Sequence, residues 1–309
     1  LEKGNIPVFG TGGYMTSVNE CIYDGETTFI GRKGSINKPF YYNGKFWTVD
    51  TLFYTHSFNK TTPKFVYCLF QTINWLRYNE ASGVPSLSKD TIEKIKVFIP
   101  QLDEQRKISE MLSVIDERIA TQNKIIEKLQ SLIRGLAVTL TTKGNFNTAI
   151  SQCLECHSST LQESEVLPNG LYKVFGANGL VGYTDVPQMN GDAILVIKDG
   201  SGVGTVSYAQ GKFSAIGTLN YLTVIDNNDL RYLYFALSVF NFQAYKTGMA
   251  IPHIYFKDYG KAKIYCPPLA EQKHIANVLD KLESKLLLEQ GILASFNWQK
   301  RYLLGQMLI

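Results

Sequence analysis

Two stretches of the chain carry apolar residues at alternating spacings of four and three. One begins after Pro100 and the other after Pro267–Pro268, and each continues for more than four heptads. A 3.5-residue apolar repeat of this length predicts a long helix with a coiled-coil seam. The expected seam residues are Ile108, Leu112, Ile115, Ile119, Ile126 and Ile133 in the first helix and Ile275, Leu279, Leu282, Leu286, Leu293 and Leu303 in the second.

Both predicted helices begin with acidic residues and carry a polar residue within the seam. Asp103, Glu104 and Glu271 occupy the first turns, where carboxylates complement the helix dipole. Gln122 and Glu289 stand at the same seam step, where they either fix the register or lie at a solvated edge. We expect the two helices to pack on each other antiparallel; a solvated bundle face without a partner is the alternative.

The segments before these helices alternate β-branched and aromatic runs with Gly and Asn, which is typical of strands between turns. The expected strands are 6–9, 27–30, 46–54 and 96–99 in the first half and 172–175, 193–197, 219–225 and 263–265 in the second. One aromatic-rich helix is expected in each half, over 64–77 and 230–245. Each half is therefore predicted to be a compact α/β domain.

The two halves form an internal repeat. Three pairs of segments match in the same order, at an offset of 166 that drifts to 167: Val8–Gly10 with Val174–Gly176, Arg32–Ser35 with Lys198–Ser201, and Leu102–Arg106 with Leu269–Lys273. Chance similarity would not stay collinear over this distance, so the chain is predicted to hold two copies of one unit. We expect the copies to lie at opposite ends of the helix pair, related by a pseudo-twofold axis.

The start of each long helix resembles the specificity subunits of type I restriction-modification systems. A Pro-x-Leu-x-Glu-Gln-x-x-Ile run lies within 98–108 and again within 266–275, each time after a Gly-rich domain. The resemblance extends over nearly the whole chain. It departs at the start, because about 30 residues lie between the first long helix and Val174 but only seven precede Val8. The edge of the first domain is therefore not defined by the repeat.

This resemblance implies an α/β (α+β) fold with two target-recognition domains joined by two long antiparallel coiled-coil helices. The implied parts are a first recognition domain (1–102), a first conserved helix (103–142), a second recognition domain (143–268) and a second conserved helix (269–309). It also implies a non-catalytic subunit that reads a split site on double-stranded DNA. The helices would set the spacer and dock two methyltransferase subunits, and restriction subunits would join the complex.

Base-reading residues differ within this family, so candidates for DNA contact come from the repeat. The aligned loops place Arg32, Lys33 and Ser35, and then Lys198 and Ser201, in a turn after a strand, where Gly lets backbone N–H groups approach phosphate. An ordinary basic hairpin tip is the alternative. Weaker candidates are Tyr14, Lys38, Tyr183, Lys246 and His253.

One aligned position changes the sign of its charge. Asp199 stands where the first copy has Lys33. A carboxylate accepts a hydrogen bond from a cytosine amine but repels phosphate, so the two copies should read different half-sites and the target should be asymmetric.

Composition permits DNA binding without requiring it. The net charge is +4, and residues 1–150 hold 18 Lys and Arg against 14 acids while the rest holds 13 against 13. A balance this small predicts that partner subunits supply much of the phosphate contact. No membrane span or export signal is visible, so we expect a cytoplasmic protein without a membrane partner. The five cysteines are unevenly spread, so we expect reduced thiols.

Sequence signals for chemistry are weak. Residues 153–157 match a short haem-attachment pattern, but no second Cys pair accompanies them. The Gly-rich run 200–204 lacks the following helix that a phosphate-binding loop needs. We therefore expect no catalytic residues, no metal and no cofactor. Two other functions stay open: the recognition part of a fused methyltransferase-endonuclease, and a stand-alone DNA-binding regulator that dimerises through its coiled coil.

Overall fold

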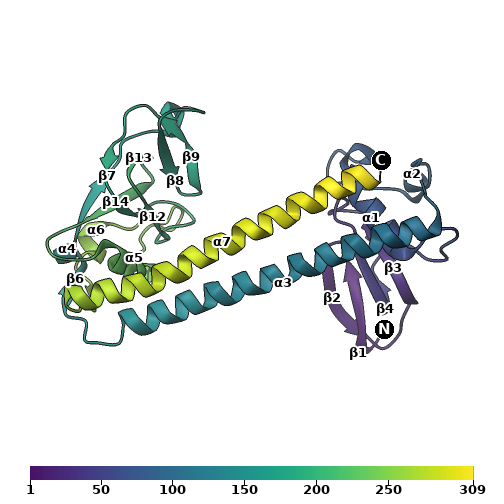
Figure 1. The fold of residues 1–309 in the computed structure, drawn as a ribbon, viewed down its shortest axis with the longest axis horizontal. Helices are drawn as coiled ribbons and strands as arrows, with labels where there is room; N and C mark the ends of the chain where they lie inside the picture. The colour runs from purple at the N-terminus through teal and green to yellow at the C-terminus, as the bar shows by residue number, and fades with distance from the viewer. Residues whose placement is uncertain (309) are drawn as a thin grey trace. The chain divides into compact units, whose positions relative to one another are not determined.

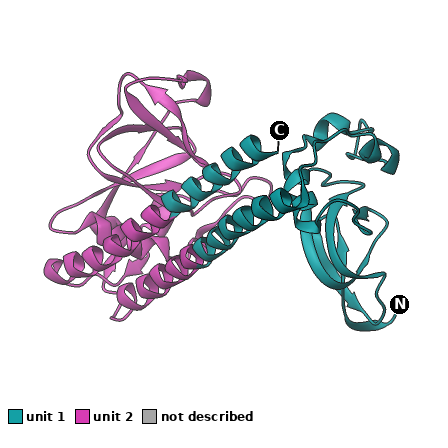
Figure 2. Cartoon of the chain, turned by 45° about the vertical axis from the view of Figure 1, so that its right-hand side comes forward, with its two compact units in different colours: residues 1–124, 290–309 teal, residues 125–289 magenta. Residues whose placement is uncertain are grey.

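The computed structural model describes residues 1–308 and divides the chain into two compact units. Unit 1 comprises Leu1–Lys124 and Gln290–Ile309, and unit 2 comprises Ile125–Glu289 (Figure 2). Each unit therefore contains one globular region together with parts of both long helices.

Unit 1 is built on one five-stranded sheet with the order β2-β1-β4-β3-β5. Within this sheet, over the described residues, only the pairing of β1 with β4 is parallel. The elements are β1 (Lys3–Gly10), β2 (Gly13–Val18), β3 (Tyr23–Gly31), β4 (Phe40–Thr48), β5 (Leu52–Tyr54), α1 (Pro63–Thr72), the 3-10 helix η1 (Trp75–Tyr78), α2 (Lys89–Glu93) and α3 (Leu102–Thr141) (Figure 1). An aromatic cluster around Phe9, Phe29 and Phe46 fills one side of the sheet.

Unit 2 contains two four-stranded sheets, ordered β10-β13-β8-β9 and β12-β11-β14-β7, and a small ladder of β15 with β6. Its elements are β6 (Thr148–Ala149), α4 (Ile150–Cys153), β7 (Leu154–Ser158), η2 (Glu163–Glu165), β8 (Tyr172–Gly176), β9 (Gly179–Thr184), β10 (Met189–Asn190), β11 (Ala193–Ile197), β12 (Val206–Ala209), β13 (Lys212–Ala215), β14 (Leu219–Val224), α5 (Leu230–Ser238), η3 (Phe242–Tyr245), α6 (Phe256–Tyr259), β15 (Lys263–Ile264) and α7 (Leu269–Met307). The uninterrupted apolar run of β11 is buried along its whole length, as such a run predicts.

The internal repeat is confirmed element by element. The helices α1, α2 and α3 and the 3-10 helix η1 correspond to α5, α6, α7 and η3, and all four pairs begin at the same offset along the chain. That offset is the one that relates the two copies of the Glu-Gln motif. The helix caps repeat too. Thr62 caps α1 by accepting the N–H of Phe65, and Asp229 caps α5 by accepting the N–H of Tyr232. The same local chemistry therefore starts the same helix in each unit.

The long helices α3 and α7 pack through their predicted apolar faces. Of the expected seam, Ile108, Leu112, Ile115, Ile126, Ile275 and Leu279 are buried, and Ile119, Ile133, Leu282, Leu286, Leu293 and Leu303 are partly buried. Gln122 and Glu289 are only 6% and 7% exposed, so the solvated-edge alternative is wrong for both.

The two helices run antiparallel. In unit 1, Ile108 and Leu112 near the start of α3 share a cluster with Leu304 near the end of α7. In unit 2, Ala137 near the end of α3 shares a cluster with Ile275 near the start of α7.

Three of the expected elements are each divided into two in the structure. The stretch 46–54 is two strands, because a turn around 49–51 separates β4 from β5, and both strands then pair antiparallel with β3, on its opposite edges. The predicted helices 64–77 and 230–245 each end early, at Thr72 and Ser238, and continue as 3-10 turns. These turns bury Trp75 and Phe242 in the core, which a continuous helix would carry round to another face.

The predicted strand at 96–99 is wrong, because this segment has no partner among residues 1–308. Its counterpart β15 pairs with β6, which lies between α3 and the first strands of the second sheet-bearing region. Side-chain exposure records the difference: Val97 is 40% exposed, and its counterpart Ile264 is 5% exposed. A β-ladder needs two strands. The two equivalent segments are similar in sequence, but a strand forms only in unit 2, where β6 lies beside it.

Candidate nucleic-acid interface

The basic loop after β3 is held by backbone hydrogen bonds to two distant segments. The N–H of Arg32 donates to the carbonyl of Thr51 at 2.8 Å, and the N–H of Gly34 donates to Pro85 at 2.8 Å. The carbonyl of Arg32 accepts from Leu87 at 2.9 Å. Gly34 has a φ of +86°, a conformation that strains any residue with a Cβ.

The loop after β11 repeats this arrangement. The N–H of Lys198 donates to the carbonyl of Thr218 at 3.0 Å, the N–H of Gly200 donates to Pro252 at 2.9 Å, and the carbonyl of Lys198 accepts from Ile254 at 2.9 Å. Gly200 has a φ of +97°. Every partner occupies the position in the repeat that its counterpart occupies in unit 1. The aligned loops are one structure built twice.

These contacts correct one expectation about the loops. The N–H groups of Gly34 and Gly200 donate to proline carbonyls, so they are not available to a phosphate. The donors that face solvent are side chains: Arg32, Lys33 and Ser201 are exposed. The run 200–204 forms a turn that leads into strand β12, as the sequence predicted.

Each loop lines a surface pocket at the equivalent place in its unit. The pocket in unit 1 has a volume of about 340 Å³ and is lined by Arg32, Lys33, Phe53, Glu80, Ser86, Leu87, Ser88 and Lys89. The pocket in unit 2 has a volume of about 270 Å³ and is lined by Cys156, Ser158, Lys198, Asp199, Asn220, Ile254, Tyr255, Phe256 and Lys257. Three cations and one acid line the first pocket, and two cations and one acid line the second, so both suit a polyanion.

The acid of the first pocket is held by hydroxyl groups. Hydrogen bonds from Thr91 and Ser88 hold the pKa of the Glu80 carboxyl below its usual range. Glu80 is therefore ionised at neutral pH, and it accepts from Ser88 rather than from the neighbouring cations.

The two loops differ at a pair of positions joined by a backbone bridge. Lys33 forms an isolated backbone bridge with Ser86 in unit 1, and Asp199 forms the equivalent bridge with His253 in unit 2. The ring of His253 also lies 5.3 Å from that of Tyr255. A cation beside a hydroxyl thus corresponds to a carboxylate beside an imidazole. The same backbone therefore presents different hydrogen-bonding groups in the two units.

Buried glutamines connect the starts of both long helices to the globular regions. The Oε1 atom of Gln105 accepts the N–H of the capping residue Thr62 at 2.9 Å, and its Nε2 atom donates to the carbonyls of Lys60 and Pro100, both at 2.9 Å. This accounts for the Gln of the Glu-Gln motif, because one buried amide satisfies three backbone groups from two segments.

The second copy of the motif makes the same connection. The Oε1 atom of Gln272 accepts the N–H of the capping residue Asp229 at 2.9 Å, and its Nε2 atom donates to Pro267 at 2.8 Å. The neighbouring sulfur of Cys266 lies 3.2 Å from the same Nε2 atom.

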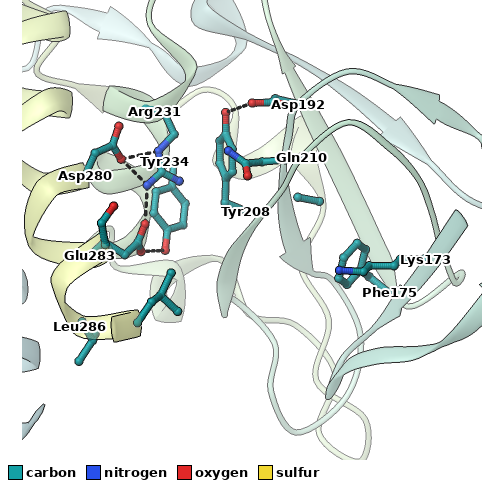
Figure 3. Close-up of a pocket in the computed structure, with 13 residues that line it drawn as sticks. Lys173, Phe175, Asp192, Tyr208, Gln210, Arg231, Tyr234, Asp280, Glu283 and Leu286 are labelled. Carbon is teal, nitrogen blue, oxygen red and sulfur yellow. Dashed lines mark hydrogen bonds and ion pairs between the residues drawn. The ribbon is translucent and has the colours of Figure 1, made fainter. Parts of the chain in front are cut away.

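A cation–aromatic cluster joins α5 to α7 beside a pocket of about 690 Å³ (Figure 3). The Nε atom of Arg231 donates to Asp280 at 2.6 Å, and the guanidinium also pairs with Glu283. The guanidinium carbon lies 4.3 Å from the ring centre of Tyr208 and 4.8 Å from that of Tyr234. Burial acts to lower the pKa of Arg231, but its hydrogen bonds to the two carboxylates outweigh burial and raise it.

Unit 1 contains a weaker counterpart of this cluster. Lys64 stands where unit 2 has Arg231, and its Nζ lies 5.9 Å from the ring centre of Tyr41. The carboxylate on α3 is Asp116, which pairs with Lys300 of α7 at 2.6 Å. Lys300 also lies 5.9 Å from the ring centre of Tyr67. The cation that meets the long-helix carboxylate thus comes from α7 in unit 1 and from α5 in unit 2.

The family model for the type I restriction modification DNA specificity domain matches residues 1–131 and again residues 154–296. The chain belongs to this family. The two matched regions each contain one of the paired pockets, so the repeated loops lie within the two specificity domains.

Relatives and solved structures agree with this assignment. The specificity subunit of the type I restriction enzyme MjaVIII from Methanocaldococcus jannaschii is 40% identical over 67 residues, which cover 22% of this chain and 16% of that protein. A putative type I specificity subunit from Haemophilus influenzae is 22% identical over an alignment that covers 97% of this chain and 86% of that protein. The S subunit from M. genitalium shares the fold with a TM-score of 0.73 at 17% identity, covering 100% of this chain and 90% of the other.

Of the weaker candidates for contact with DNA, Lys246 and His253 lie near the second loop. Lys246 directly precedes Thr247, which exchanges two backbone hydrogen bonds of 2.9 Å with His253, the residue bridged to Asp199 of the second loop. Tyr14 is exposed on β2, and its hydroxyl lies 3.1 Å from that of Ser17. Among the described contacts, none joins Lys38 or Tyr183 to a pocket. Ser35 is partly buried within the first loop.

Sequence reasoning missed two pocket cations, Lys89 and Lys257. They come from segments more than fifty residues after the loops, and the structure brings them to the pockets. The repeat could have indicated both lysines, because the segments around Pro85 and Pro252 align and each is followed within five residues by one of them. The Arg231 cluster was missed as well, although Tyr67 and Tyr234 stand at equivalent positions of the repeat.

Across residues 1–308, no group of three or more His, Cys, Asp or Glu side chains is placed to hold a metal ion. The same part of the chain contains no helix with the length and apolar character needed to cross a bilayer. All five cysteines are free thiols.

Proposed function

We propose that this chain is the DNA-reading, non-catalytic subunit of a type I restriction-modification complex. Two target-recognition domains, 1–102 and 143–268, each read one half of a split, asymmetric site on double-stranded DNA. The helices of 103–142 and 269–309 set the spacer between the halves and dock two methyltransferase subunits. Restriction subunits join through that complex.

The observation that carries this proposal is the repeated pocket with exchanged side chains. The same loop, held by the same backbone hydrogen bonds, presents Lys33 with Ser86 in one unit and Asp199 with His253 in the other. A lysine donates to acceptors such as guanine O6 and N7, and an aspartate accepts from a cytosine amine. Such an exchange on one scaffold is what two different half-sites require.

The electrostatics support a division of labour among subunits. Each pocket has only a small excess of cations, and the net charge of the chain is +4. Tight DNA binding needs more phosphate contacts than these pockets supply, so the methyltransferase subunits provide the rest. The salt dependence of DNA affinity should therefore be steeper for the complex than for this chain alone.

Co-expression with the cognate methyltransferase subunit, followed by mapping of methylated bases, tests the proposal. We expect methylation at a bipartite motif whose two halves differ. Replacement of Lys33 by Asp should change or abolish recognition of one half only, and Asp199→Lys should affect only the other. Lys45→Asp, an exposed charge reversal away from both pockets, is the matched control. A palindromic motif would contradict asymmetric reading, and failure to assemble or to direct methylation would overturn the whole assignment.

A further inference from the structure

Two thiols from segments far apart in the sequence meet next to the start of α7. Cys153 is the last residue of α4, and Cys266 directly precedes Pro267. Their sulfur atoms are 3.9 Å apart although 113 positions separate the two residues. Cys153 is fully buried, and Cys266 is partly exposed.

Hydrogen bonds hold the two segments together next to these sulfurs. Ala149 pairs with Lys263 in the ladder of β6 with β15. The side chain of Asn147 completes the clamp, because its Oδ1 accepts the N–H of Cys266 and its Nδ2 donates to the carbonyl of Cys266, both at 2.9 Å. A disulfide bond measures about 2.05 Å, so closure requires the sulfurs to approach by about 2 Å.

Polar groups surround the sulfur of Cys266. The Cys153 and Cys266 sulfurs lie within hydrogen-bonding distance, and Nε2 of Gln272 donates to the Cys266 sulfur at 3.2 Å; when protonated, the Cys266 thiol donates to Oδ1 of Asn228 at 3.3 Å. The hydrogen bond from Cys153 holds the pKa of Cys266 below its usual range, while the same bond and burial raise the pKa of Cys153. The thiolate is the reactive form of cysteine, so the more accessible sulfur is also the more reactive one.

We propose that Cys153 and Cys266 form a redox modification site that a hydroperoxide converts to a disulfide. In the first step the Cys266 sulfur attacks the peroxide, the O–O bond breaks, and the products are a sulfenic acid on Cys266 and a hydroxide or alkoxide that takes up a proton. In the second step the Cys153 sulfur attacks the Cys266 sulfur, the S–S bond forms, and the S–O bond breaks. The hydroxide leaves as water with the proton of the Cys153 thiol. Two thiols are oxidised by two electrons, and one peroxide is reduced.

The disulfide would link the end of α4 covalently to the segment that directly precedes α7. It also removes the sulfur acceptor from Gln272, the residue that joins α7 to the cap of α5. Unit 1 has no equivalent, because Ile99 stands at the position of Cys266. Oxidation therefore acts on one recognition unit alone, and closing so long a loop constrains the unfolded chain and raises the thermal midpoint of unit 2.

Treatment of the full chain with hydrogen peroxide, in a Cys156→Ser background, tests the proposal. That background removes the neighbouring thiol of β7. We expect the intact mass to fall by about 2 Da and to recover with a dithiol reductant. A non-reducing tryptic digest should yield one species that links residues 144–173 to residues 264–273. Hydrogen exchange across residues 147–153 should slow in the oxidised protein.

Two variants distinguish formation of this disulfide from other oxidation of the protein. Cys266→Ser and Cys153→Ala should each abolish the linked peptide, the slowed exchange and the rise in thermal midpoint; near-native reduced spectra would show that each variant folds. If a variant fails to fold, thiol titration of the oxidised Cys156→Ser protein still decides, because the proposal requires loss of two thiols. A sulfenic or sulfinic acid on Cys266 without the link to Cys153, or unreacted thiols, would overturn the proposal.

Discussion

Replacing Arg231 by methionine tests whether the cation–aromatic cluster holds the second recognition domain to its long helix. Methionine keeps much of the side-chain volume but removes the charge. Loss of the guanidinium leaves Asp280 and Glu283 without their shared cation and removes the cation–π contacts with Tyr208 and Tyr234. The side chain of Arg231 is 20% exposed, so the pair is only partly desolvated.

The magnitude follows from that partial exposure. Breaking a fully buried pair costs about 3–5 kcal/mol, while an exposed pair contributes about 0–1 kcal/mol. The side chains of Asp280 and Glu283 are 37% and 27% exposed, which places this cluster between the two limits. We expect Arg231→Met to lower the free energy of unfolding of unit 2 by about 2 kcal/mol.

The matched control is Lys64→Met in unit 1, at the equivalent position of the repeat. Lys64 is exposed and lies 5.9 Å from the Tyr41 ring, so its loss should cost about 0.5 kcal/mol. Because the two units need not unfold together, the assay is hydrogen exchange of the α1 and α5 amides under native conditions. Equal costs for the two substitutions, or unchanged exchange in α5 after Arg231→Met, would refute the reasoning.

Three further predictions concern unit 1. Gln105→Leu should lower the midpoint of urea unfolding by an amount equivalent to about 2–3 kcal/mol, since it leaves three backbone groups unsatisfied, whereas Gln101→Leu at an exposed position should change it little. Arg32→Ala should reduce the salt slope of DNA binding by the assembled complex by about 1, and Lys45→Ala should not; an unchanged slope would remove Arg32 from the interface. Hydrogen bonds lower the pKa of Glu80, so their stabilising contribution is present above the ordinary glutamate pKa and is lost as pH falls through the lowered value. NMR titration of the carboxyl carbon checks this, and a titration at the ordinary value would contradict it.

The sequence was sufficient for features that depend on local periodicity. The heptad spacing predicted both long helices because a helix hydrogen-bonds within itself, so its apolar stripe is visible in a single segment. Residue-by-residue alignment of the two halves predicted the repeat and the paired loops at Arg32–Ser35 and Lys198–Ser201. Their equivalence holds down to the backbone partners of Gly34 and Gly200.

Features that require two distant segments came only from the tertiary structure. Residues 96–99 have the composition of a strand but lack the partner that β15 has in β6, so propensity alone could not place them. The sequence predicted that the N–H groups of the loop glycines would be open to phosphate, but in the structure they donate to the carbonyls of Pro85 and Pro252. In each case the outcome depends on a group more than fifty residues away.

The sequence by itself determined the two long helices, the duplication and the position of the loops that differ between the copies. Only the tertiary structure decided what surrounds those loops: the lysines at 89 and 257, the facing pairs Lys33 with Ser86 and Asp199 with His253, and the meeting of Cys153 with Cys266. The physical reason is that helical periodicity is written into neighbouring residues. Pockets and thiol pairs instead depend on how the chain returns to itself, which no local pattern encodes.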